Sequence, residues 1–451
     1  MTSDLQPAFR PETSILALGG EFYDAVRPAD FPQATLRFRN QRWAARVGLG
    51  ALSDEDWVRH FARFEALPGS LPQPLALRYH GHQFRVYNPD IGDGRGFLFA
   101  QLRDDGGRLL DLGTKGSGQT PYSRFGDGRL TLKGGVREIL ATEMLEALGV
   151  DTSKTFSLIE TGEALDRGDE PSPTRSAVLV RLSHGHIRIG SFQRLAYFKD
   201  EAGLRTLTDY VLRHYFDDAS GDPLRLLDHV VARTARLAGQ LMAAGFVHGV
   251  LNSDNINVTG ESFDYGPWRF APGWDPGFTA AYFDHQGLYA FGRQPEAIHW
   301  DAMQLAVSLR AVAADEPMIA ILDQFAPRYR AAVAAALLWR LGVKPGGDDQ
   351  ALAAAIEHGL TESQAPVADF FHASFGGTIA DSFGPAFAEA RQRLQSYAPR
   401  KARGLYWQGA PCAMLIDEVE AIWAAIDQRD DWQPLHAKID QIRAMGTALA
   451  D

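Results

Sequence analysis

The chain has 451 residues, of which 45% are hydrophobic and 22% charged, so it has enough apolar material for a large folded core. Its net charge of -11 at pH 7 argues against a general nucleic-acid binder, because such proteins gather Lys and Arg in excess of acidic residues. A single cysteine, Cys412, excludes an intramolecular disulfide and fits a reducing compartment. The sequence has no signal-peptide pattern and no apolar run of membrane-spanning length, so we expect a cytoplasmic protein whose partners include neither nucleic acid nor membrane.

Short runs of β type, separated by Gly-rich turns, dominate the first part of the chain. Residues 96–102 (GFLFAQL), 108–114 (RLLDLGT) and 176–183 (SAVLVRLS) predict strands, because they are short, apolar and bounded by turn signals. Between them, residues 136–149 (VREILATEMLEALG) repeat apolar side chains at helical spacing. We therefore predict a mixed α/β N-terminal lobe over residues 1–200.

Helical periodicity takes over in the second half. It is clearest in residues 226–246, 299–314, 329–342 and 412–426. We predict a mainly helical C-terminal lobe over residues 201–451, and thus an α+β chain with two lobes. The Gly- and Pro-rich segment 266–295 interrupts the helical pattern, and its aromatic content predicts an ordered loop rather than a linker.

Residues 248–266, HGVLNSDNINVTGESFDYG, have the spacing of a protein-kinase catalytic loop followed by a metal-binding triplet. Kinases place a catalytic Asp two residues after a His, an Asn five residues beyond that Asp, and then Asp-Phe-Gly. Here Val250 occupies the position of the catalytic Asp, whereas Asn255 and Asp264 keep the two metal-binding positions. A carboxylate stands instead at Asp254, next to Asn255. The pattern indicates phosphate-anhydride chemistry with a displaced base.

Three basic residues of the first half are candidates for phosphate contacts. Lys115 ends a strand-like run and precedes a Gly-rich turn, so its ammonium and the backbone N–H groups of the turn can approach a phosphate together. Glu138, on the predicted helix, is a candidate ion-pair partner for Lys115. Arg181 and Arg188 flank a turn between two strand-like runs, so both can enter one pocket from neighbouring strands. Each of these residues, taken alone, is also compatible with an ordinary surface charge.

A series of long motifs occurs in one order along the chain. They are GHQF (81–84), IGDGRG (91–96), KGSGQTPYSRFGDGR (115–129), REILATEML (137–145), HIRIGSFQ (186–193), HGVLNSDN (248–255), DYGP (264–267) and DHQGLYAFGRQP (284–295). Together they closely resemble the selenoprotein O family of protein adenylyltransferases, the YdiU-type pseudokinases. The resemblance covers roughly residues 20 to 310.

The resemblance implies a protein-kinase-like bilobal fold that binds ATP in an inverted orientation, so that the α-phosphate faces the acceptor. AMP would then pass to the hydroxyl of a Ser, Thr or Tyr side chain on a protein, with Mg2+, or alternatively Mn2+, as the metal. Carried over residue by residue, the resemblance implies that Lys115, Arg181 and Arg188 contact the phosphates and that Glu138 forms an ion pair with Lys115. Asp254 would accept the proton, and Asn255 and Asp264 would bind the metal. The nucleotide pocket would be lined by Gly92, Gly94, Arg95, Asp127, Gly128 and Asp264.

The chemistry of nucleotidyl transfer independently requires such a set. An Asn oxygen and a carboxylate are hard ligands suited to magnesium, which takes water and nucleotide phosphates as its other ligands. The metal and cationic side chains neutralise the charge that gathers at phosphorus. A weak carboxylate base is then adequate for the acceptor hydroxyl.

Three other functions stay open from the sequence. A kinase-like phosphotransferase that uses the γ-phosphate is disfavoured by Val250. A silent nucleotide-binding scaffold is disfavoured because Lys115, Asn255 and Asp264 are all present. Transfer of UMP instead of AMP stays open, because the wall that contacts the base cannot be identified from the sequence.

The C-terminal third departs from the family pattern. Beyond about residue 310 we no longer recognise the sequence of the family, so acceptor recognition is expected to differ. Segment 266–295 holds no cysteine that could pair with Cys412, which excludes an intramolecular redox switch.

Overall fold

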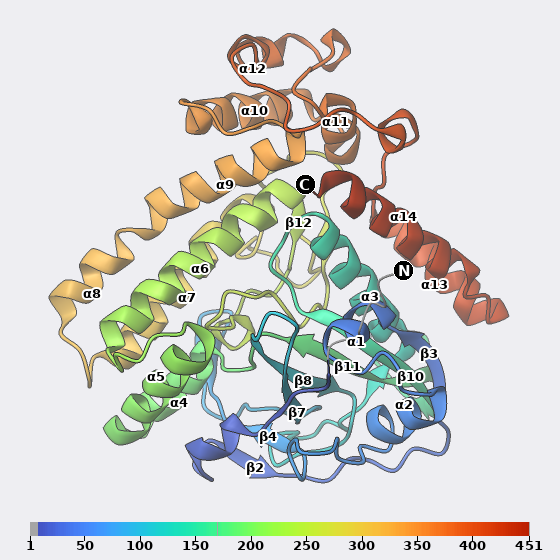
Figure 1. The fold of residues 1–451 in the computed structure, drawn as a ribbon, viewed down its shortest axis with the longest axis vertical. Coiled ribbons are helices and arrows are strands. Elements are labelled where there is room, and N and C mark those ends of the chain that lie inside the picture. The colour runs from blue at the N-terminus through green and yellow to red at the C-terminus, as the bar shows by residue number, and fades with distance from the viewer. Residues whose placement is uncertain (1–7, 169, 451) are drawn as a thin grey trace.

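The computed structural model describes residues 8–168 and 170–450. Figure 1 shows a sheet with short helices in the N-terminal half and a group of longer helices in the C-terminal half. The α+β class predicted from the sequence is confirmed. Among the described residues, no helix combines the length and the apolar character that a membrane crossing requires.

One antiparallel sheet of nine strands forms the core of the N-terminal half. Its main path runs β2 (Tyr23–Ala25), β4 (Leu75–Leu77), β7 (Leu98–Arg103), β8 (Leu109–Lys115), β11 (Thr174–Ser183), β10 (Lys154–Leu165) and β3 (Thr35–Arg39). At its sides, β1 (Pro11–Glu12) pairs with β7 and β9 (Leu130–Thr131) pairs with β11. The three strands predicted from the sequence are β7, β8 and β11, which lie next to one another at the centre of the sheet.

Both faces of this sheet are covered by helices. Ala177 and Leu179 of β11 belong to the apolar cluster that contains α3 (Leu132–Ala147). Val178 and Val180 of the same strand belong to a second cluster, together with α1 (Gln41–Arg46) and α2 (Asp54–Phe61). Successive side chains of a strand point to opposite faces, so burial on both faces explains why these strands read as continuous apolar runs.

Helix α3 lies close against strand β10. A Cβ atom on Gly135 would lie 2.3 Å from Cδ1 of the buried Leu158, so a larger residue here would displace this leucine side chain. The helix begins after Thr131, whose side chain accepts a hydrogen bond of 3.1 Å from the Gly134 N–H. This packing fixes the helix that carries Glu138.

Helices form most of the C-terminal half. They are α4 (Ile189–Tyr197), α5 (Glu201–Tyr215), α6 (Pro223–Ala244), α7 (Gln294–Leu309), α8 (Asp315–Leu322), α9 (Phe325–Leu341), α10 (Asp349–Ser363), α11 (Val367–Ser374) and α12 (Ala388–Leu394). Helix α6 packs against both α7 and α9. It begins at Pro223 and ends before Gly245, whose φ of 68° lies in the left-handed region. The helices predicted in segments 226–246, 299–314 and 329–342 correspond to α6, α7 and α9.

Two small two-stranded sheets lie outside the main one. The first pairs β5 (Gly81–Gln83) with β6 (Val86–Asn88), and the second pairs β12 (Phe246–Val247) with β13 (Arg269–Phe270). Strand β13 belongs to segment 266–295, in which Trp274 and Phe291 are buried. The prediction of an ordered loop in this segment is confirmed.

The last two helices, α13 (Ile416–Arg429) and α14 (Gln433–Leu449), return to the N-terminal half and pack on α3 (Figure 1). Arg443 of α14 donates hydrogen bonds of 2.8 and 2.9 Å to the Glu143 carboxylate of α3. The helix predicted over residues 412–426 begins only at Ile416. The boundary predicted between residues 200 and 201 stays a prediction.

Candidate active site

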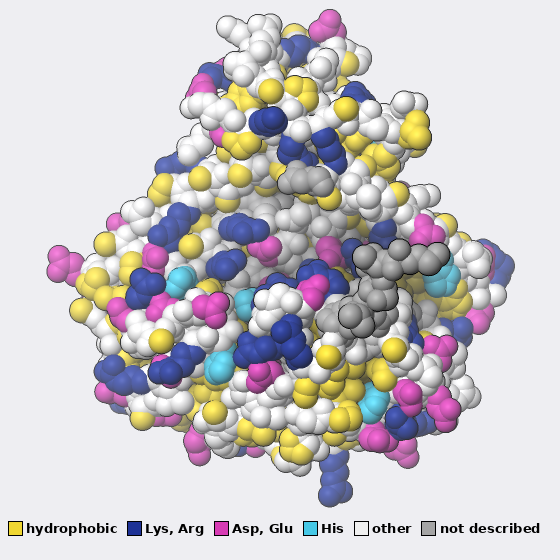
Figure 2. Space-filling model, viewed as in Figure 1, with side chains coloured by type: hydrophobic (Ala, Val, Ile, Leu, Met, Phe, Trp, Pro, Cys, Tyr) yellow, Lys and Arg dark blue, Asp and Glu magenta, His cyan; other side chains and the backbone are white. Residues whose placement is uncertain are grey.

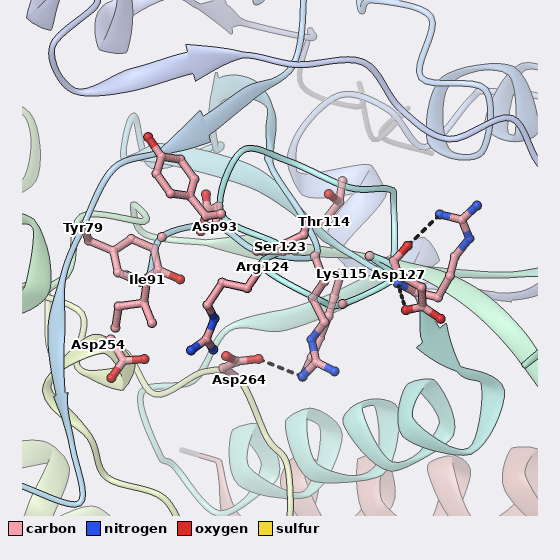
Figure 3. Close-up of a pocket in the computed structure, with 18 of the residues that line it drawn as sticks. Tyr79, Ile91, Asp93, Thr114, Lys115, Ser123, Arg124, Asp127, Asp254 and Asp264 are labelled. Carbon is pink, nitrogen blue, oxygen red and sulfur yellow. Dashed lines mark hydrogen bonds and ion pairs between the residues drawn. The ribbon is translucent and has the colours of Figure 1, made fainter. Parts of the chain in front are cut away.

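A cavity of about 620 Å³ lies between the central strands of the sheet and loops of the helical half. This volume is typical of pockets that hold a small-molecule substrate. Most of the residues predicted from the sequence line it: Gly92, Gly94, Arg95, Lys115, Asp127, Gly128, Arg181, Arg188, Asp254 and Asp264. Figure 3 shows Lys115 on the sheet, with Asp254 and Asp264 on segments of the helical half. The predicted residues Glu138 and Asn255 are not part of the lining; Glu138 contacts Lys115, and Asn255 follows Asp254 in the chain.

The cavity has an excess of positive charge. Seven cationic side chains line it against four carboxylates, although the whole chain has a net charge of -11. On the molecular face drawn in Figure 2, by contrast, Lys and Arg side chains are interspersed with Asp and Glu. A concave site lined by one sign of charge concentrates ions of the opposite sign. The cavity therefore suits a polyanion such as a nucleoside triphosphate.

Lys115 is the last residue of β8, a strand whose residues are all buried. Its ammonium forms an ion pair with the Glu138 carboxylate of α3, as the sequence predicts. It also lies 2.7 Å from Oδ1 of Asp264. A lysine side chain is flexible, so two carboxylates on different elements restrict where its charge can stand.

Arg181 lies on β11, directly opposite Gly113 of β8. Its Nε donates a hydrogen bond of 3.3 Å to Nε2 of His186. Burial lowers the pKa of His186, so the ring is neutral and can accept this bond, while its Nδ1 lies 3.4 Å from the Asp111 carboxylate. The Nη1 atom of Arg181 lies 3.6 Å from Oδ1 of Asp264, but it is buried and has no hydrogen-bond partner among the described residues, so it can donate to an anion in the cavity.

Arg188 does not lie on a neighbouring strand, and that part of the sequence prediction is wrong. It is the N-cap of α4, because the apolar run that follows it continues as a helix. Its guanidinium lies 3.1 Å from the Asp93 carboxylate and donates a hydrogen bond of 2.9 Å to the Asp254 carbonyl. The centre of the Phe263 ring lies 4.9 Å from the Arg181 guanidinium and 4.8 Å from that of Arg188, so one aromatic ring contacts both cations.

Two glycines in the turns around the cavity pack closely against neighbouring segments. A Cβ atom on Gly92 would lie 2.5 Å from the Tyr122 ring. Gly128 has a φ of +70°, which L-residues with a side chain rarely adopt. Between these turns, Arg95 forms no ion pair with a described residue, so its charge is available to a ligand.

Asp254 and Asn255 lie in a short 3-10 turn, Ser253–Asn255. The Asn255 side-chain NH2 donates a hydrogen bond of 3.1 Å to the carbonyl of Val250, the residue at the kinase base position. This bond leaves the Asn255 carbonyl oxygen free to bind a cation. Asp254 is 7% exposed, and Oδ1 of its carboxylate has no hydrogen-bond partner among the described residues. Burial raises the pKa of Asp254 to about 6, against the nearby charge of Arg188.

Asp264 has a φ of 62°, an uncommon value for a residue other than glycine. Burial alone would raise its pKa, but Lys115, Arg181 and further cations hold the pKa well below its usual range. Its carboxylate is therefore ionised at neutral pH. No group of three or more His, Cys, Asp or Glu side chains within residues 8–168 and 170–450 could hold a metal ion. The Asn255 amide oxygen and the ionised Asp264 carboxylate nevertheless fit magnesium, which needs few protein ligands when phosphates supply the rest.

The sequence did not single out the residues that contact Arg181 and Arg188 from the sides, namely Asp93, Tyr79 and Phe263. Asp93 forms an ion pair with Arg188, and its signal was its place inside the IGDGRG motif. Tyr79 packs its ring 4.3 Å from the Arg188 guanidinium. Phe263 supports both arginines and precedes Asp264 in the chain. An isolated aromatic residue has no pattern of its own, so only its position in the fold reveals the contact.

Comparison with known proteins gives one consistent result. A profile of the family described as protein adenylyltransferase SelO matches residues 7–396. A protein nucleotidyltransferase YdiU of Gloeobacter violaceus is 44% identical over 98% of this chain and 95% of its own length. A protein of the same name from Synechococcus elongatus is 42% identical over 100% of this chain and 97% of its own length. One from Vibrio cholerae is 38% identical over 69% of this chain and 63% of its own length.

These matches also correct one expectation. The family profile extends to residue 396 and the alignments to relatives span nearly the whole chain, so the family pattern does not end near residue 310. The cationic cavity and the whole-chain similarity agree on the kind of enzyme. The chain therefore belongs to the SelO family of protein adenylyltransferases and is a nucleotidyltransferase that acts on a nucleotide and a protein substrate.

Proposed function

We propose that this protein transfers AMP from ATP to the hydroxyl of a Ser, Thr or Tyr side chain, with ATP bound in the inverted orientation. The observation that carries the proposal is the cluster of Lys115, Arg181 and Arg188, each at most 5% exposed. Each of the three lies near a carboxylate, but Nη1 of Arg181 and Nε of Arg188 have no hydrogen-bond partner among the described residues and can bind phosphate oxygens. The β- and γ-phosphates carry most of the charge of ATP. When these phosphates bind the buried cluster, the α-phosphate is the one nearest the acceptor.

Asp254 is our candidate for the proton acceptor. Its carboxylate lines the cavity, its Oδ1 has no other hydrogen-bond partner among the described residues, and burial raises its pKa towards neutrality. A base with such a pKa removes a proton from a hydroxyl more readily than an ordinary carboxylate does. The pyrophosphate that leaves would remain paired with Lys115 and the two arginines.

Magnesium, or alternatively manganese, is the metal we propose, with Asn255 and Asp264 as its protein ligands. The metal would supply neutralisation of phosphate charge and a fixed orientation of the triphosphate. The protein side chains orient the same phosphates: Lys115 is held by Glu138, and Arg181 by His186. Gly92 packs against the Tyr122 ring and Gly128 against the Gly118 backbone, which keeps the shape of the turns that line the cavity.

The test is to incubate the purified protein with magnesium, a mixed protein extract as acceptor, and ATP labelled at either the α- or the γ-phosphate. Protein-bound label from the α-position alone is expected. Label from the γ-position alone would contradict the proposal and indicate a phosphotransferase. Asp264→Ala serves as the inactive control, and α-labelled UTP in a parallel reaction tests whether UMP is the group transferred.

A further inference from the structure

A second cavity, of about 260 Å³, lies where α3, α9 and α11 meet the chain segment 412–415. Its walls are mainly apolar and include Met144, Leu148, Phe270, Val367 and Met414. It shares no lining residue with the cavity of the candidate active site. Asp369, which is exposed, lies at its rim. A pocket of this size suits a ligand smaller than a nucleotide.

One cation, Arg340 of α9, stands in the wall of this cavity. It is 6% exposed, and its guanidinium lies 3.9 Å from the centre of the Phe371 ring. It donates a hydrogen bond to the carbonyl of Ala243. Among the described residues, no carboxylate lies within salt-bridge distance of it. Burial lowers the pKa of Arg340 to about 9, so the side chain is still protonated at neutral pH.

A buried charge without a counter-ion is costly, and proteins normally pair it. Arginine has five N–H donors in a planar fork, and Arg340 uses one hydrogen bond to a described residue. The remaining donors match the two oxygens of a carboxylate. His372 adds no second positive charge at neutral pH, because burial lowers its pKa, and Cys412 adds no negative charge, because burial raises the pKa of its thiol. A single negative charge therefore balances the site.

We propose that this cavity binds a small apolar monocarboxylate. The carboxylate would pair with the free donors of Arg340, and the hydrocarbon chain would lie among Met144, Leu148 and Val367. The exposed carboxylate of Asp369 at the rim disfavours entry of a second negative charge. Because Met144 and Leu148 lie on or next to α3, the ligand would touch the helix that also carries Glu138.

The first experiment is thermal unfolding of the full chain with octanoate, octanol or octylamine. Octanoate at about ten times its Kd is expected to raise Tm by about 1–2 °C, because a ligand that binds only the folded state stabilises it. Octanol and octylamine have the same chain without the carboxylate and should have no comparable effect. If about 10 mM octanoate causes no change in Tm, the proposal is overturned, because this concentration exceeds the Kd expected for a ligand of this size.

The site of binding is tested through Cys412, which lines the cavity and is the one cysteine of the chain. Bound octanoate should slow its alkylation by iodoacetamide, and octylamine should not. Stabilisation by octanoate without any change in the alkylation rate would place the ligand elsewhere and overturn the proposal.

Arg340→Met should weaken octanoate binding about tenfold or more, because it removes a charge-assisted pair of hydrogen bonds and keeps most of the side-chain volume. Arg330→Met, at an exposed position of the same helix, is the matched control and should bind normally. If Arg340→Met does not fold, Ala368→Phe fills the cavity without removing the charge and should also abolish binding. Normal binding by Arg340→Met or by Ala368→Phe would refute the assignment.

Discussion

The cations and the carboxylates of the candidate active site come from two different kinds of backbone. Lys115 and Arg181 lie on adjacent central strands of the sheet, whereas Asp254 and Asp264 lie on irregular segments of the helical half. Strand residues are held by ladder hydrogen bonds on both sides, but Asp264 is held with a φ of 62°, a strained value. The difference teaches that the sheet fixes the buried cations Lys115 and Arg181, while loops decide where Asp254 and Asp264 stand.

Lys115 is the point where the two regions meet. Its ammonium contacts Glu138 on α3 and lies 2.7 Å from Asp264 on the loop. The Asp264 carboxylate is thus positioned against the sheet by Lys115, and Nη1 of Arg181 lies 3.6 Å from the same oxygen. Substitutions on either side of this junction should therefore have different consequences.

The largest effect is expected for Asp264→Asn. The substitution removes the negative charge that faces Lys115 and that we propose binds the metal, so kcat for adenylyl transfer should fall at least about 10³-fold. Protein-bound label from α-labelled ATP measures it. Asp275→Asn, at an exposed position of a neighbouring loop, should keep full activity. An Asp264→Asn protein within about tenfold of the parent rate would show that the loop carboxylate is dispensable.

A smaller loss is expected for Asp254→Asn. If Asp254 is the base, kcat should fall about 10²- to 10³-fold, because general-base catalysis contributes rate rather than binding. Titration of the variant with ATP should give an unchanged Kd. A weakened Kd with normal kcat would instead assign Asp254 to nucleotide binding.

Glu138→Gln should reduce kcat/KM by about tenfold, since it removes one of the two carboxylates that position Lys115. The loss is partial because Asp264 still lies 2.7 Å from the ammonium. In a Lys115→Met background the same substitution should have no further effect, because its only route to the substrate is gone. Additive losses in this double-mutant cycle would contradict a positioning role.

The smallest effect concerns stability of the sheet rather than chemistry. His184 follows β11, its ring lies 5.4 Å from Tyr215, and burial lowers its pKa from 6.5 to about 3. The unfolded chain therefore binds the proton first, so this contribution to stability is complete above pH 6.5 and is lost as pH falls below it. The cost is up to about 1.4 kcal/mol for each pH unit below that value.

Urea unfolding at about pH 7 and about pH 5.5 measures this slope. His184→Phe keeps an aromatic ring against Tyr215 without a titrating group, so the variant should lose less stability than the parent on acidification. The parent should still show a residual slope, because burial also lowers the pKa of other histidines, among them His80. An identical loss in parent and variant would exclude His184 as a source of the pH dependence.

Much of the fold could be predicted from the sequence because its signals are local. The apolar runs of β7, β8 and β11 and the periodicity of α3, α6, α7 and α9 depend only on near neighbours in the chain. Where the prediction was wrong, a local pattern was ambiguous. The run after Arg188 is short and apolar, so it reads equally as a strand, but it begins helix α4.

The candidate site was predicted to a similar extent. Recognisable motifs contain Lys115, Glu138, Asp254 and Asp264, so the sequence could identify these residues as candidates although it could not show where they lie in space. The contacts made by Tyr79 could not be predicted, because they depend on segments that lie far apart in the chain.

The sequence by itself determined which residues carry charge, which runs are strands or helices, and that the kinase base position holds Val250. Only the tertiary structure decided that Lys115 meets Asp264, that α14 returns to α3, and that Arg340 is buried without a carboxylate partner among the described residues. The physical reason is that propensity and periodicity are properties of neighbouring residues, whereas ion pairs and cavities arise when packing brings distant segments together.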